Sequence, residues 1–213
     1  MKPSVRIPFL SLCGLLLAAS AQASPWSANI GYNSEYIYRG IPQKNSSAFA
    51  GVDYENNGFY AGAWGADVGD GIEIDYYGGY NWEGDEVTLG AGFTLYTYTG
   101  DFDDTYKEIN LSAGWKWFTL DVAIGEYDNF DASTLDYSFY SLTAEHNGLY
   151  GKVGTFGDDF DGSYYEAGYG STVSVNDMDL FDYAIAVIHS DATLLGGDSD
   201  TNLIFTLSKA FDF

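Results

Sequence analysis

The stretch Trp26-Ser-Ala-Asn-Ile-Gly-Tyr-Asn-Ser-Glu-Tyr-Ile-Tyr38 places apolar or aromatic residues at most even positions and Ser, Asn, Gly or Glu at most odd ones. This period of two is typical of a β-strand with one apolar face. The same alternation recurs in residues 72–76, 87–95, 108–115 and 119–124. After residue 24 there is no run of eighteen apolar residues, so the sequence does not predict a membrane-spanning helix.

Turn-forming residues divide the chain into about twelve strands, which we place at 26–39, 47–55, 59–68, 72–82, 87–98, 106–116, 118–127, 136–145, 149–156, 163–174, 178–189 and 202–213. Connections after even strands are tight and include Asn57-Gly58 and Asn147-Gly148, which favour hairpin turns. Most connections after odd strands are longer and acidic, among them 40–46, with 69–71 as a short exception. Short turns at one end and long loops at the other predict an all-β fold, a transmembrane antiparallel up-and-down β-barrel.

A soluble β-sandwich or a lipocalin-like barrel also alternates, so two further features matter. The polar face is rich in Gly, Ala, Ser and acidic residues, which could line water but could not pack as a protein interior. The last strand has apolar residues at every second position from Leu203, except at Lys209, and ends with Phe211 and Phe213. It resembles the carboxy-terminal signal that directs barrels to the outer-membrane barrel assembly machinery, which we therefore expect as a partner.

Residues 1–23 form a predicted signal peptide, with Lys2 and Arg6, an apolar stretch at 9–19 and a small-x-small cleavage site ending at Ala23. Residues 24–213 then form the barrel domain. The single cysteine, Cys13, lies in the leader, so no disulfide is expected in the mature chain. The predicted location is the outer membrane of a Gram-negative cell, with outer-membrane lipid around the barrel.

The charge of the chain argues against a nucleic-acid-binding protein, and its aromatic content argues against a disordered one. The chain carries 8 basic and 31 acidic residues, a formal net charge of −23, and has no basic run, so a nucleic-acid partner is not expected. Its 19 Tyr, 14 Phe and 5 Trp argue against disorder. Aromatic residues near strand ends, including Trp26, Trp82, Trp115 and Tyr127, are predicted to form interfacial girdles.

By alternation, the charged residues that should face the lumen are mostly acidic. They are Glu35, Arg39, Asp53, Glu55, Glu73, Asp75, Glu108, Lys116, Asp121, Glu145, Lys152, Glu166 and Asp182. A barrel of about twelve strands has a narrow interior, and an acidic lining attracts cations and repels anions. We expect Arg39 to pair with Glu35 or with an acid on the adjoining strand and to brace the wall.

The long loops hold a second set of acids, Asp101, Asp103, Asp104, Asp158, Asp159 and Asp161. Such oxygen ligands suit divalent cations, although their spacing does not match the calcium-binding loop, and a solvated rim that concentrates cations is the simpler interpretation. Two His and no mature Cys predict no transition-metal site and no cofactor. His189 with Asp191 is the one candidate general-base pair, and we do not predict an enzyme.

Several segments together carry a family resemblance. Residues 34–43 (Ser-Glu-Tyr-Ile-Tyr-Arg-Gly-Ile-Pro-Gln), with 52–54, 58–64, 73–80, 96–98 and 106–108, resemble the TorF family of porins, and the likeness extends over essentially the whole mature chain. The resemblance implies an outer-membrane pore of unidentified substrate. Together these features predict a passive channel for small polar solutes that prefers cations. The alternative is a non-conducting structural or adhesive barrel whose acidic loops bind cations.

Overall fold

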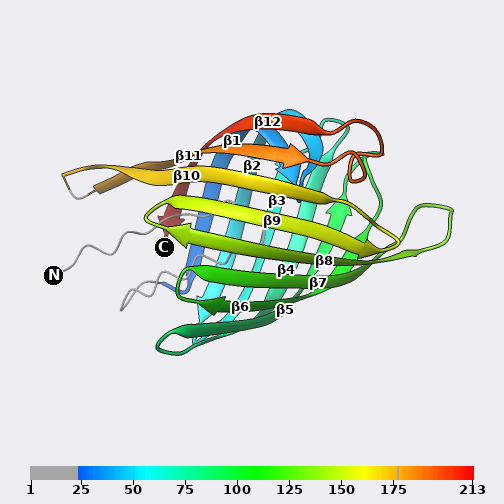
Figure 1. The fold of residues 1–213 in the computed structure, drawn as a ribbon. Helices are drawn as coiled ribbons and strands as arrows, with labels where there is room; N and C mark the ends of the chain where they lie inside the picture. Colours follow the sequence, from blue (N-terminus) through cyan, green and yellow to red (C-terminus); the bar gives the residue numbers. More distant parts are fainter. Residues whose placement is uncertain (1–23, 177) are drawn as a thin grey trace.

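The computed structural model describes residues 24–176 and 178–213, and the predicted signal peptide 1–23 lies outside them. The strands are β1 (Trp26–Tyr38), β2 (Ile41–Asn56), β3 (Phe59–Asp67), β4 (Ile72–Glu83), β5 (Val87–Tyr98), β6 (Tyr106–Trp115), β7 (Phe118–Tyr127), β8 (Leu135–His146), β9 (Leu149–Asp158), β10 (Ser163–Val175), β11 (Met178–Ser190) and β12 (Asp200–Asp212). Each strand pairs antiparallel with its neighbours in sequence, and β12 pairs with β1 (Figure 1). The closed twelve-strand barrel confirms the predicted fold class.

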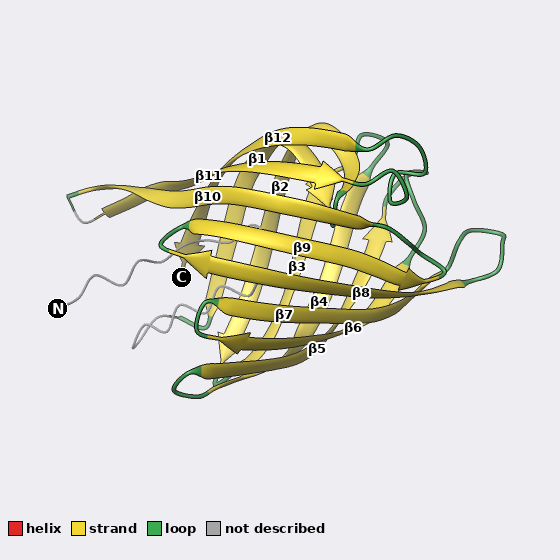
Figure 2. Ribbon diagram, in the orientation of Figure 1, coloured by secondary structure: helices red, strands yellow, loops and turns green. Residues whose placement is uncertain are grey.

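The connections between strands differ at the two ends of the barrel. At the end where β1 begins and β12 finishes, two-residue turns such as Asn57-Gly58 and Asn147-Gly148 join the strands. Their φ angles of 51° and 83°, and of 51° and 82°, are the paired positive values that tight hairpins require. Loops project from the opposite end (Figure 2). Across the described residues, we find no helix of the length and apolarity needed to cross a bilayer.

The wall has an apolar outer face. Ile30, Phe93, Ile109 and Ile124 are each more than half exposed although they lie in the middle of strands. The residues between them along each strand point inward, and many of these are Gly, Ser, Thr or carboxylates. Because every strand in a closed barrel has two neighbours, the backbone groups are satisfied within the wall and the apolar side chains can face lipid.

The first hairpin departs from the predicted wall. β1 pairs with β12 only from Ser27 to Asn33, and β2 pairs with β3 only from Phe49 onward. Beyond these points, β1 and β2 pair with each other as far as Tyr38 and Ile41, and we call residues 34–48 the inner hairpin. The expected long loop at 40–46 is therefore wrong, because Arg39 and Gly40, with φ of 48° and 81°, make a tight turn and β2 begins at Ile41.

The inner hairpin lies inside the barrel. Tyr36 is only 1% exposed and packs with Phe49 and Trp64, and Ile37 and Ile41 pack against a buried cluster on β7 to β12. The Ser190 hydroxyl donates a hydrogen bond to the Gly40 carbonyl at 2.6 Å. A bulge between Tyr36 and Ile37 bends the ladder where the hairpin turns inward.

The sequence of the second half of this hairpin explains why it leaves the wall. Residues 43–47 read Gln-Lys-Asn-Ser-Ser and offer no apolar face to lipid. A lysine exposed in the hydrocarbon region is costly, whereas inside the barrel Lys44 forms an ion pair with Asp67 at the rim. The alternation in β1 indicated an outward-facing Tyr36, and the structure corrects this because both faces of the hairpin are enclosed by the barrel.

Candidate functional site

The turn of the inner hairpin places the guanidinium of Arg39 against the opposite wall of the lumen. Arg39 Nη1 and Nη2 donate to the two carboxylate oxygens of Glu108 on β6, at 2.9 and 2.8 Å. The Arg39 side chain is 10% exposed and that of Glu108 is completely buried. The guanidinium also lies 4.3 Å from the ring centroid of Phe139, within range of a cation–π contact. Arg39 thus pairs across the lumen, and the expected pairing with Glu35 or an adjoining strand is replaced by this contact.

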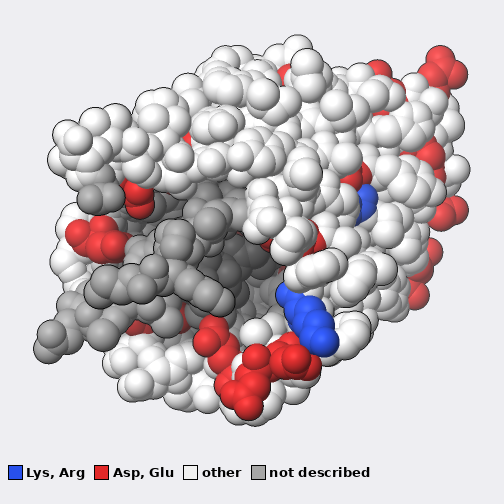
Figure 3. Space-filling model, turned by 60° about the vertical axis from the view of Figure 1, so that its left-hand side comes forward, with Lys and Arg blue, Asp and Glu red and all other residues white. Residues whose placement is uncertain are grey.

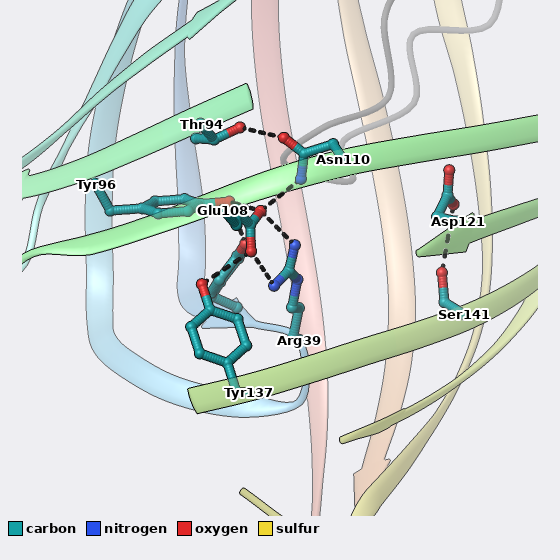
Figure 4. Close-up of polar contacts among 9 residues, drawn as sticks. Arg39, Thr94, Tyr96, Glu108, Asn110, Asp121, Tyr137 and Ser141 are labelled. Carbon is teal, nitrogen blue, oxygen red and sulfur yellow. Dashed lines mark hydrogen bonds and ion pairs between the residues drawn. The ribbon is translucent and has the colours of Figure 1, made fainter. Parts of the chain in front are cut away.

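Glu108 receives three further hydrogen bonds. The hydroxyls of Tyr96 and Tyr137 donate at 2.7 and 2.9 Å, and the Asn110 amide donates at 2.7 Å (Figure 4). Asn110 is held in turn by Thr94 at 2.8 Å. A buried carboxylate with five donors, two of them from a bidentate guanidinium, is a well-satisfied ion pair, which fixes the position of the hairpin turn in the lumen.

Two more carboxylates are buried beside the hairpin on β4. Glu73 is 1% exposed and accepts a hydrogen bond from the Tyr36 hydroxyl. Asp75 is 2% exposed, and its Oδ1 has no hydrogen-bond partner among the described residues. Asp75 interacts electrostatically with Glu73, Glu108 and Arg39. Because Arg39 is already matched by Glu108, buried carboxyl groups outnumber buried cations among the described residues of this part of the lumen.

The other acids expected in the lumen are partly exposed and make polar contacts along the strands. Asp121 accepts from the Ser141 hydroxyl at 3.3 Å, and Asp182 accepts from the Thr172 hydroxyl at 2.6 Å. Asp53 accepts a hydrogen bond from the Tyr77 hydroxyl, and Glu166 accepts one from the Tyr150 hydroxyl and interacts with Lys152. Glu35 lies in the inner hairpin, and Glu55 and Glu145 lie near the ends of β2 and β8.

Lys116 lies in the turn after β6, which ends at Trp115, one residue earlier than predicted. Its φ is 55°, and its ammonium group lies 3.7 Å from a carboxylate oxygen of Glu86 in the neighbouring turn. Both side chains are at least half exposed, so this pair belongs to the rim at the short-turn end of the barrel.

A cavity of about 270 Å³ lies between the inner hairpin, the walls of β5, β6, β8 and β9, and two of the loops. Eight of its thirteen lining residues are aromatic. Phe102 and Asp103 reach it from the loop after β5, and Phe160 reaches it from the loop after β9. Sequence reasoning did not find this cavity, because alternation shows which residues point inward and not that a hairpin meets them there.

The loop acids serve mainly as hydrogen-bond acceptors. Asp103 accepts from the hydroxyls of Tyr106 and Tyr127 at 2.9 and 2.7 Å, so Tyr127 lies inward and not in an interfacial girdle. Asp104 accepts from the Phe130 amide, Asp159 from the Asp136 amide and Asp161 from the Gly162 amide. Over the described ranges, no three His, Cys, Asp or Glu side chains are grouped as a metal site would need. Asp101 and Asp158 lie in and beside the same two loops.

Acidic side chains gather at both ends of the molecule, and the surface between them is mostly uncharged (Figure 3). The end that faces the viewer in that figure is hollowed, and carboxylates lie around the hollow.

The two members of the candidate general-base pair contact different partners. His189 Nδ1 lies 2.8 Å from the Thr201 hydroxyl, while Asp191 accepts hydrogen bonds from the amides of Ser163 and Leu194.

Comparisons with known proteins place this chain in a bacterial family and support the fold. A family model described as "Bacterial protein of unknown function (Gcw_chp)" matches residues 18–179, and it does not confirm the TorF name. No curated protein matches the chain.

Solved structures share the barrel at low identity. One described as "Unveiling the Mechanism Behind the in-meso Crystallization of Membrane Proteins" has a TM-score of 0.55 at 12% identity, over 88% of this chain and 83% of that chain. The outer membrane protein OprD from Pseudomonas aeruginosa has a TM-score of 0.43 at 14% identity, over 100% of this chain and 74% of that chain. The outer membrane protein opdK from the same organism has a TM-score of 0.43 at 15% identity, over 91% of this chain and 68% of that chain.

Proposed function

Because the chain belongs to the Gcw_chp family of bacterial proteins of unknown function, we propose its function from the barrel itself. It is an outer-membrane channel through which small polar solutes diffuse passively, with a preference for cations. The observation that carries this proposal is a closed wall with an apolar outer face and an interior with more acids than bases.

The outer face supports a membrane location. Its exposed Ile, Leu, Val and Phe side chains need a nonaqueous surrounding, and a closed barrel leaves no unpaired strand edge for lipid to meet. The predicted signal peptide, the aromatic carboxy-terminal strand and the resemblance to the TorF porins support export and assembly in the outer membrane.

The interior supports passage of cations. Partly exposed carboxylates such as Asp121 and Asp182 lie along the lumen, while the guanidinium of Arg39 is matched by Glu108. In a narrow pore, a lining of one sign raises the local concentration of ions of the opposite sign. No step of this function requires catalysis or a cofactor.

One observation favours a second candidate, a non-conducting structural or adhesive barrel with acidic, cation-binding loops. The inner hairpin lies within the lumen and is packed on two sides by buried clusters. A hairpin held in this way narrows the path at the loop end of the barrel. In the channel we propose, solutes pass beside it or it moves aside.

The test is single-channel recording of the refolded protein in a planar lipid bilayer under a potassium chloride gradient. We expect discrete steps and a reversal potential of the sign that indicates cation selectivity. An anion-selective reversal potential would contradict the proposed lumen. Silence, both from the wild type and from a variant that releases the inner hairpin, with circular dichroism showing folded β structure, would instead support the non-conducting barrel.

A further inference from the structure

We propose that the cavity between the inner hairpin and the loops is a binding site for a small organic cation of the quaternary or alkylated ammonium class. This inference deepens the proposed channel function and rests on it, because it names the class of solute that the same lumen takes up. The argument uses the rings that line the cavity, the charge around it and its size.

Aromatic rings reach the cavity from several parts of the fold. Tyr98 and Phe102 lie with ring centroids 5.6 Å apart on one side, and Tyr137 and Phe160 lie 5.3 Å apart on another. Tyr38 brings a further ring from the inner hairpin. Faces of aromatic rings attract cations through their quadrupole, and rings that surround a cavity are the usual site for quaternary ammonium groups.

The charge at the cavity is negative. Asp103 lines it and accepts hydrogen bonds only from neutral groups in the described structure: two tyrosine hydroxyls and the Asp104 amide. Arg39 also lines the cavity, but its guanidinium is engaged by both oxygens of Glu108. An organic anion in the cavity would therefore be repelled by Asp103, and Arg39 would not be available to neutralise it.

Two buried carboxyl groups lie beside the cavity. Tyr98, which lines it, interacts electrostatically with Glu73, Asp75 and Asp103. Asp75 is 98% shielded from solvent, and its Oδ1 lacks a hydrogen-bond partner within the described chain. A positive charge near a buried carboxyl group stabilises the ionised form of that group. A cation in the cavity would therefore be favoured by these neighbours, whereas an anion would be disfavoured.

The size and the ligand types exclude other occupants. A volume of about 270 Å³ is slightly below the range of small-molecule sites, which span roughly 300–1,000 Å³, so only a compact solute fits. A bare divalent ion would need several oxygen ligands converging on one point, whereas the lining here is mainly aromatic. A compact cation with an apolar surface matches both the rings and the charge.

The test is calorimetric titration of the folded, detergent-solubilised protein with choline and with its uncharged isostere 3,3-dimethylbutan-1-ol. We expect choline to bind at least tenfold more tightly, since only the charged compound gains the cation–π and carboxylate interactions. Phe102→Leu and Phe160→Leu keep an apolar side chain but remove a ring, and each should weaken choline binding by about threefold or more. Asp103→Asn should weaken it as well.

Phe93→Leu is the matched control, because this ring is 56% exposed on the outer face and should leave choline binding unchanged. Equal binding of choline and the isostere, no binding of either, or wild-type affinity in both ring variants would overturn the proposal. A protein that conducts ions but fails to bind choline would refute this inference alone. A protein that binds choline in a silent bilayer would refute the channel and leave the site standing.

Discussion

Replacing Arg39 with Met removes the charge that holds the inner hairpin against the far wall while keeping a side chain of similar length. Arg39 gives both of its terminal nitrogens to Glu108, whose side chain is completely buried. After the substitution, that carboxylate keeps only its neutral donors, Tyr96, Tyr137 and Asn110.

The magnitude follows from this burial. Removing one partner of a buried ion pair costs about 3–5 kcal/mol, and the three remaining donors place this case near the lower value. A loss of about 3 kcal/mol changes the ratio of docked to undocked hairpin roughly a hundredfold. If the wall is unchanged, the cost falls on the docking of the hairpin, and the lumen should open more often.

The assay is single-channel recording of Arg39→Met beside Lys44→Met. Lys44 lies on the same hairpin and pairs with Asp67, but their side chains are 26% and 46% exposed, and a solvent-screened pair of this kind contributes little to stability. We expect Arg39→Met to show larger or longer openings and Lys44→Met to resemble the wild type. In the double variant Arg39→Met, Glu108→Gln, the effect should be smaller than the sum of the single ones.

Identical conductance and opening times in Arg39→Met and Lys44→Met would refute the reasoning. It would show that apolar packing around Tyr36, Ile37 and Ile41 holds the hairpin without the ion pair. A loss of folded β structure in Arg39→Met would instead place the cost on the whole barrel, which urea titration in lipid vesicles would measure.

Three further predictions concern the wall and the lumen. In single-tryptophan variants within brominated lipid, Trp115, which is 51% exposed, should be quenched and Trp64, which is 9% exposed, should not; equal quenching would contradict the assignment of faces. Gly79→Ala should lower the free energy of unfolding in urea by about 1–3 kcal/mol, because its Cβ would lie 2.3 Å from the Ala91 carbonyl oxygen, whereas Gly197→Ala, with open space, should change it by less than about 0.5 kcal/mol. Asp121→Asn should move the reversal potential toward zero, and an unchanged potential would remove Asp121 from the conducting path.

Much of the wall could be predicted from the sequence, because residues of a barrel strand point alternately to lipid and to the lumen. A two-residue period of apolar residues therefore identifies a strand and its lipid-facing side. Most strand bounds agree with the structure to within a residue or two. The tight turns were predicted because Asn-Gly pairs supply the two positive φ angles that such hairpins need.

The inner hairpin could not be found in this way. Alternation continues through Tyr36 and Tyr38, but it only separates the two faces of the strand. It does not show whether a face meets lipid, water or protein. The polar run 43–46 falls within the predicted loop 40–46, although a strand enclosed by protein can be polar on both faces. The partner of Arg39 depends on a contact between residues 69 positions apart, which no local pattern carries.

The position of the inner hairpin has a consequence for the order in which the molecule assembles. The hairpin belongs to the first two strands of the described chain, yet it touches Ser190, 150 residues later than Gly40, and β1 takes its second partner from β12. Contacts of such long sequence separation form slowly. Docking of the hairpin at Ser190 and pairing of β12 with β1 both join the first strands to the last ones, so we expect both to be late events in assembly. The strands that are made first are the last to find all of their neighbours.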